Sequence, residues 1–153
     1  MKKCLKIGSK QRKTMDIEMS INGHDIREWG LTPLKGTLAS LMQPANMKAL
    51  TYNDSRAIHG SRALLVNRRV SKRDLSLLFH IHTLSDIDLA RRIDQLVEIL
   101  INGKSNSGEN EVFVPRFNRT YKLVFTGFDS YAGMKEGRAT IGITFTELNP
   151  TDR

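Results

Sequence analysis

Residues 75–103 read LSLLFHIHTLSDIDLARRIDQLVEILING and contain the two clearest periodic patterns of the chain. In the first part, every second residue from Leu75 to Ile81 is large and apolar, a spacing typical of a strand with one buried face. In the second part, apolar residues recur three and four positions apart, which predicts an amphipathic helix over about residues 86–102. A strand followed directly by one helix therefore forms the centre of the expected fold.

Both ends of this helix carry residues that helix ends prefer. Ser85 is a good N-cap, and Asp88 three positions later makes an arrangement close to a capping box. Gly103 follows the last helical residue, where glycine commonly ends a helix in a left-handed conformation. The expected apolar face comprises Leu89, Ile93, Leu96, Val97 and Leu100.

Short strands are expected on both sides of this centre. The Asn22-Gly23 dipeptide favours a tight hairpin turn, and it follows an alternating segment at residues 15–20. Residues 31–50 are irregular and interrupted by prolines, so we expect loop or edge structure there. Further strands are expected at residues 111–114, 119–128 and 138–148, with residues 129–137 linking the last two as a hairpin.

The order of these elements defines the expected fold class. Short strands with one internal helix and no βαβ alternation predict a mainly β fold (α+β), an antiparallel β-sandwich with the helix packed on it. A chain of 153 residues corresponds to one ordinary domain, which we place at residues 15–153. The apolar runs are far shorter than the ~20 residues that span a bilayer, so no membrane-spanning helix is predicted.

Positive charge is concentrated at the start of the chain. The chain has 24 Lys and Arg against 16 Asp and Glu, a net charge of +8, and no acidic residue precedes Asp16. We interpret residues 1–14 as a basic flexible leader, and a nucleic-acid-binding or partner-binding arm is the alternative function for it. Its basic residues are Lys2, Lys3, Lys6, Lys10, Arg12 and Lys13.

The sequence lacks the motifs of the common enzyme classes. It has no phosphate-binding glycine loop, no GxSxG elbow and no HExxH motif, and its single cysteine, Cys4, excludes an internal disulfide. His80 and His82 lie two apart in an expected strand and could share a metal ion with His24 or His59, but a solvent-facing pair is the favoured interpretation. We therefore expect no catalytic, cofactor or metal site.

Two further candidates have structural explanations. Asp86 and Asp88 form a carboxylate pair at the helix N-terminus, where they complement the helix dipole. Trp29 follows the first expected hairpin, and we expect it to anchor the turn rather than to stack on a ligand.

The order of motifs over about residues 15–150 resembles the distal tail proteins of long-tailed bacteriophages. Each motif is weak by itself, and their order carries the resemblance. The similar elements are the opening hairpin at residues 21–26 with Trp29-Gly30-Leu31, the turn at His59-Gly60, the strand at residues 73–79, the helix ending at Gly103, the segment at residues 119–123 and the closing hairpin that ends at residues 145–150.

The resemblance implies a structural role. In that family the N-terminal domain is a β-sandwich with one helix, and copies close into a ring, a hexamer, that joins the tail tube to the hub at the tail tip. The expected partners are other copies of the chain, the tail tube protein and the tail hub or tape-measure protein, in a virion assembled in the bacterial cytoplasm. A tail terminator or tail tube protein is the structural alternative.

The irregular segment supplies the candidate subunit interface. It is richer in apolar residues than a solvated loop, so we expect it to pack against a neighbouring subunit. The candidate interface residues are Leu34, Leu38, Leu41, Met42 and Met47.

Overall fold

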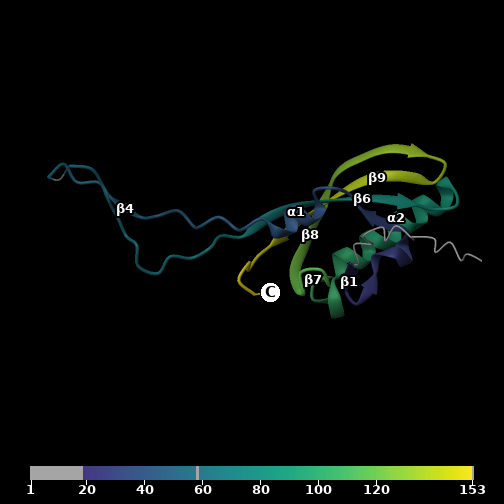
Figure 1. Cartoon of the computed structure of the whole chain (residues 1–153), viewed down its shortest axis with the longest axis horizontal. Helices are drawn as coiled ribbons and strands as arrows, with labels where there is room; N and C mark the ends of the chain where they lie inside the picture. Colours follow the sequence, from purple (N-terminus) through teal and green to yellow (C-terminus); the bar gives the residue numbers. More distant parts are fainter. Residues whose placement is uncertain (1–18, 58, 153) are drawn as a thin grey trace, which may run out of the picture.

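The computed structural model describes residues 19–57 and 59–152, and within them the antiparallel strands form a sandwich-like sheet with one long helix (Figure 1). The seven strands of the main sheet follow the order β2-β1-β7-β8-β9-β6-β3. The predicted fold class is therefore confirmed. The strands are β1 (Ser20–Ile21), β2 (His24–Asp25), β3 (Leu31–Pro33), β6 (Arg73–His82), β7 (Asn110–Val114), β8 (Arg119–Lys135) and β9 (Arg138–Glu147), and a separate pair is formed by β4 (Tyr52–Asn53) and β5 (Arg62–Ala63).

The long strand β8 joins the two halves of the sheet. Its first residues, up to Leu123, pair with β7, and from Val124 onward it pairs with β9. Three register shifts along the β8–β9 ladder mark bulges, which increase twist and bend a strand. The strand therefore takes part in both halves of the sheet, and its bend lets the two halves fold around a common core.

The predicted central strand and helix are both present. Strand β6 alternates between buried and more exposed residues along its length, with Leu75, Leu77, Phe79 and Ile81 on the buried face. It pairs with β9 over ten residue pairs. Helix α2 (Asp86–Asn102) has the predicted bounds, and the Ser85 hydroxyl accepts a hydrogen bond from the Asp88 backbone N–H at 3.3 Å. Gly103 ends the helix with φ of 69°.

The first hairpin forms at the predicted dipeptide. Asn22 and Gly23 have φ of 55° and 83°, the positive values that a tight turn between β1 and β2 requires. The Asn22 side chain also ties this turn to β7, since it donates to Asn110 Oδ1 at 3.0 Å and accepts from the Glu111 backbone N–H at 3.0 Å. Of the expected strand at residues 15–20, residues 15–18 lie outside the described part of the chain.

Two local predictions need correction. The link between the last strands is shorter than residues 129–137, because β8 continues to Lys135 and the turn consists of Glu136 and Gly137. The segment at residues 31–50 contains an edge strand, β3, as expected, but also an unpredicted helix α1 (Thr37–Met42). Tertiary contacts hold α1, since the buried Thr37 hydroxyl donates to the Leu78 carbonyl at 2.6 Å and accepts from the Leu78 N–H at 3.1 Å.

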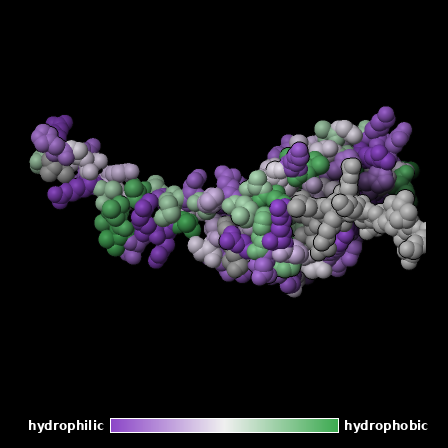
Figure 2. Space-filling view, viewed as in Figure 1, coloured by the Kyte–Doolittle hydropathy of each residue, from purple (hydrophilic) through white to green (hydrophobic). Residues whose placement is uncertain are grey.

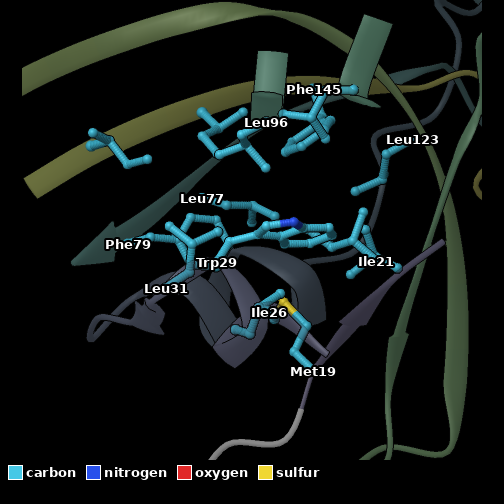
Figure 3. Packing of buried hydrophobic residues seen from close by; sticks show 14 of the residues in the cluster. Met19, Ile21, Ile26, Trp29, Leu31, Leu77, Phe79, Leu96, Leu123 and Phe145 are labelled. Carbon is cyan, nitrogen blue, oxygen red and sulfur yellow. The ribbon is translucent and has the colours of Figure 1, made fainter. Parts of the chain in front are cut away.

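The described residues form one hydrophobic core between the sheet, α2 and the 3₁₀ helix η1 (Ile26–Trp29), and Figure 3 shows its packing. Leu77 and Phe79 of β6, Leu96 of α2 and Phe145 of β9 all point into this core. Trp29 is 8% exposed and belongs to this core, as the anchor interpretation predicted. None of the helices in residues 19–152 that can be described has the length and apolarity needed to cross a bilayer.

Candidate functional site

A long arm, residues 43–72, projects from the body between α1 and β6 (Figure 1). Its two legs pair near the body, where Met47 forms an antiparallel bridge with Val70 and the Lys48 N–H donates to the Arg69 carbonyl at 2.8 Å. They pair again through the short strands β4 and β5. The arm thus consists of two lightly paired legs that extend away from the core.

The root of the arm is fixed by a buried ion pair. Arg73, the first residue of β6, binds Glu147 of β9 through Nη2 at 2.6 Å and Nε at 2.8 Å, and these side chains are only 6% and 0% exposed. The remaining guanidinium nitrogen, Nη1, donates to the carbonyls of Leu41, at 3.0 Å, and Gln43 at the start of the arm. One side chain therefore connects the end of α1, the arm and the last residue of β9.

Beyond its root, the arm presents large apolar side chains to solvent. Leu64, Leu65 and Val66 are 61%, 63% and 68% exposed, and Tyr52 on the opposite leg is 61% exposed. Figure 2 shows hydrophobic side chains gathered on the arm between its tip and the body. Single exposed apolar residues are common on protein surfaces, but a continuous group on a thin projection marks an interaction surface.

Beyond the leader, the net positive charge of the chain is confined to the arm. Six basic residues stand against one acidic residue, Asp54, a net charge of +5. Outside the arm and residues 1–14, 12 Lys and Arg stand against 15 Asp and Glu, a net charge of −3. The arm and the body thus have opposite charge. The basic residues of the arm are Lys48, Arg56, Arg62, Arg68, Arg69 and Lys72.

The five residues of the predicted subunit interface differ in how exposed they are. Leu41 is 0% exposed and lies in the core, so within a single chain it presents no surface to a neighbour, and the interface assignment stays a prediction. Leu38 packs against the core and Leu34 is partly buried. Met42 and Met47 are 47% and 43% exposed, beside and within the arm, and remain candidates.

The other sequence candidates do not come together. His80 and His82 lie on one face of β6, His24 lies against Trp29, and His59 lies near the tip of the arm. Among residues 19–57 and 59–152, no group of three or more His, Cys, Asp and Glu side chains is placed to hold a metal ion. Cys4 and the basic leader residues Lys2, Lys3, Lys6, Lys10, Arg12 and Lys13 lie outside the described residues.

Two expected carboxylates have local roles. Asp86 accepts a hydrogen bond from the Gly137 N–H at 2.8 Å, and so joins the start of α2 to the β8–β9 turn. Asp88 lies in the first turn of α2, where its charge complements the helix dipole.

Sequence reasoning missed the apolar surface of the arm. The run at residues 63–66 follows a glycine turn and resembles a buried strand, yet the structure exposes it. The sequence does contain one indication of this exposure, because charged residues lie close on both sides of the run, namely Arg62, Arg68 and Arg69.

The fold and site together define a small antiparallel β-sandwich with one packed helix and one projecting, cationic arm. No protein-family model matches the chain, and no curated protein matches its sequence. Among solved structures, the fold is similar to that of the SPP1 Dit protein, with a TM-score of 0.61 and 15% identity. That protein is described as a paradigm of the hub adsorption apparatus in phages that infect Gram-positive bacteria.

The similarity extends over 87% of this chain and 50% of the SPP1 protein, so the chain spans half the length of its structural neighbour. At this identity the likeness shows a distal-tail-like fold, in agreement with the order of motifs in the sequence.

Proposed function

We propose that this protein is a structural, non-enzymatic component of a phage or prophage tail, of the distal-tail type. In this proposal its copies close into a ring, with six subunits as the family resemblance implies. The ring joins the tail tube to the hub at the tail tip, so its neighbours are the tube protein and the hub or tape-measure protein. The similarity to SPP1 Dit, over 87% of the chain, supports this proposal.

The observation that carries the proposal is the exposed apolar surface of the arm. A thin projection with Leu64, Leu65 and Val66 in water gains free energy when another molecule covers these side chains. The arm projects from one end of the molecule, and we infer that a neighbouring copy receives it with a different surface. Contacts between two different surfaces of identical chains form rings when the rotation closes.

The test is the mass and shape of the purified full-length chain. Native mass spectrometry and negative-stain electron microscopy are expected to give a closed ring of six copies. The triple variant Leu64→Ser, Leu65→Ser, Val66→Ser is expected to be monomeric at the same concentration. Its melting temperature stays close to that of the wild type, because the three side chains are exposed and contribute little to the core.

A matched control changes exposed apolar residues of the body instead. Leu84 and Ile87 are 93% and 73% exposed at the start of α2, so the variant Leu84→Ser, Ile87→Ser removes a similar apolar area. This control is expected to retain the ring. A wild-type chain that remains monomeric at high concentration would refute the proposed function.

A further inference from the structure

A cleft of 780 Å³ lies where the base of the arm meets the segment after β9. Its lining combines positive charge with apolar surface. Four basic residues contribute to it, namely Lys48, Arg68, Arg69 and Lys72. Three apolar residues contribute as well, namely Met47, Val70 and Leu148, and Leu148 is 59% exposed.

The cations of this cleft lack neutralising neighbours. None of the described residues that line the cleft is acidic. The side chains of the four basic residues form no ion pair within residues 19–57 and 59–152. Four like charges beside one another repel, and an anionic partner would relieve that repulsion.

A surface of the opposite character lies on the second half of α2. Asp94, Glu98 and Ile101 are spaced four and three residues apart, so they lie on one face of the helix. All three are exposed, Ile101 by 59%. The sequence from Ile93 to Asn102 contains no Lys or Arg.

This half of the helix is electrostatically unfavourable by itself. The C-terminal end of a helix carries partial negative charge, which cations stabilise and carboxylates do not. Glu98 adds negative charge near that end and Asp94 adds another charge one turn earlier, and neither forms an ion pair with a described residue. A cationic partner would therefore bind here at low electrostatic cost.

We propose that the cationic cleft of one subunit receives the acidic face of α2, formed by Asp94, Glu98 and Ile101, from a second copy. The carboxylates meet the basic rim, and Ile101 covers the apolar floor around Met47 and Leu148. The net charges of +5 on the arm and −3 on the body favour the same pairing. The inference rests on the proposed ring, for which it supplies a second contact beside the one made by Leu64, Leu65 and Val66.

The apolar floor favours a polypeptide over a nucleic acid as the occupant. A phosphate backbone satisfies cations but leaves exposed side chains such as Leu148 uncovered. The acidic face of α2 offers both carboxylates and an exposed isoleucine. A contact between cleft and helix is also heterologous, as ring closure requires.

Charge exchange tests the contact in the full-length protein. Reversal of the cleft (Arg68→Glu, Arg69→Glu) or of the helix (Asp94→Lys, Glu98→Lys) places like charges together. Each double variant is expected to raise the subunit dissociation constant about tenfold or more in sedimentation at low salt. The quadruple variant, which carries both reversals in every chain, is expected to recover most of the wild-type affinity, because the charges are again complementary.

A matched control reverses an exposed acid and base elsewhere. Glu136→Lys with Arg138→Glu alters two charges at the β8–β9 turn, and it is expected to leave the dissociation constant unchanged. Carbodiimide cross-linking of mixed isotope-labelled and unlabelled wild-type chains gives a direct readout. Cross-links from Lys48 or Lys72 to Asp94 or Glu98 are expected between labelled and unlabelled copies.

The outcomes separate this contact from the proposed ring. A wild-type ring whose stability neither double variant changes would overturn the contact and leave the ring intact. A cleft variant that keeps the ring but loses low-salt binding to duplex DNA would identify the cleft as a nucleic-acid site and overturn the contact. A wild-type chain that forms no assembly would overturn both.

Discussion

At the scale of single residues, the buried pair of Arg73 and Glu147 holds the root of the arm to the sheet. Replacing Arg73 by leucine removes the cation beside a carboxylate that is 0% exposed, and it removes the donor to the Leu41 carbonyl. We expect a loss of about 3–5 kcal/mol in the free energy of unfolding, the usual cost of breaking a buried ion pair. Urea denaturation followed by tryptophan fluorescence measures this loss.

The exposed pair of Lys122 and Asp152, whose atoms lie 2.7 Å apart, supplies the comparison. Lys122→Leu breaks an ion pair that water already screens, so its unfolding midpoint is expected to remain close to that of the wild type. Equal destabilisation by the two variants would show that burial does not decide the strength of the Arg73 pair.

Gly30 is required by a close backbone contact as well as by its conformation. Its φ is +73°, and a Cβ at this position would lie 2.3 Å from the His82 carbonyl oxygen. Gly36 has φ of +95° but open space around it. Gly30→Ala is therefore expected to destabilise the protein by about 1–3 kcal/mol more than Gly36→Ala. Both variants force alanine into a left-handed conformation, but only the alanine at position 30 clashes with a neighbour. Parallel thermal melts of the two variants measure the difference, and equal losses would refute the clash.

Sequence patterns predicted buried residues well where periodicity was strong and poorly where burial depends on distant contacts. The buried face of β6 follows directly from alternation. Leu41 is buried because α1 packs on β6, whose Leu78 binds Thr37 across 41 residues of sequence. The pairing of Arg73 with Glu147 spans 74 residues. No local pattern contains such information.

At the scale of elements, the N-cap of α2 can be tested by itself. Ser85→Ala removes the hydroxyl that accepts from the Asp88 N–H, so the free energy of unfolding is expected to fall by about 1 kcal/mol. Ser85→Asp keeps a capping oxygen and is expected to retain most of the stability. Ser61→Ala in the exposed arm provides the control, and a loss there equal to that of Ser85→Ala would contradict a capping effect.

The bounds of the elements were predictable where end signals exist. Ser85 and Gly103 predicted the two ends of α2, and Asn22-Gly23 predicted the position of the first hairpin turn. The last hairpin was misjudged because residues 129–135 contain glycine and polar residues that suggest a loop. In the structure the β9 partner strand continues to bind these residues, and ladder hydrogen bonds outweigh their low strand propensity.

At the scale of the whole molecule, the arm is expected to be the first part that trypsin cleaves within residues 19–152. It contains six Lys and Arg residues on legs with few backbone hydrogen bonds, and such segments open at low cost. In the monomeric variant Leu64→Ser, Leu65→Ser, Val66→Ser, the first cuts after residue 18 are expected between residues 48 and 72. In the wild-type assembly the same sites are expected to be protected.

Mass spectrometry of the fragments over time identifies the sites. Arg91 and Arg92 lie within α2 and serve as internal controls that resist cleavage in both forms. Rapid cleavage of the arm in an assembled wild-type sample would mean that the subunits associate without covering it.

The position of Arg73 has a mechanical consequence. The second leg of the arm runs directly into the first residue of β6, which faces Glu147 in the ten-pair ladder with β9. A pull on the arm therefore acts along the strand axis and loads all rungs of the ladder together, whereas a pull across the sheet would open them one after another. The second leg of the arm is thus attached where all ten residue pairs of this ladder oppose a pull along β6.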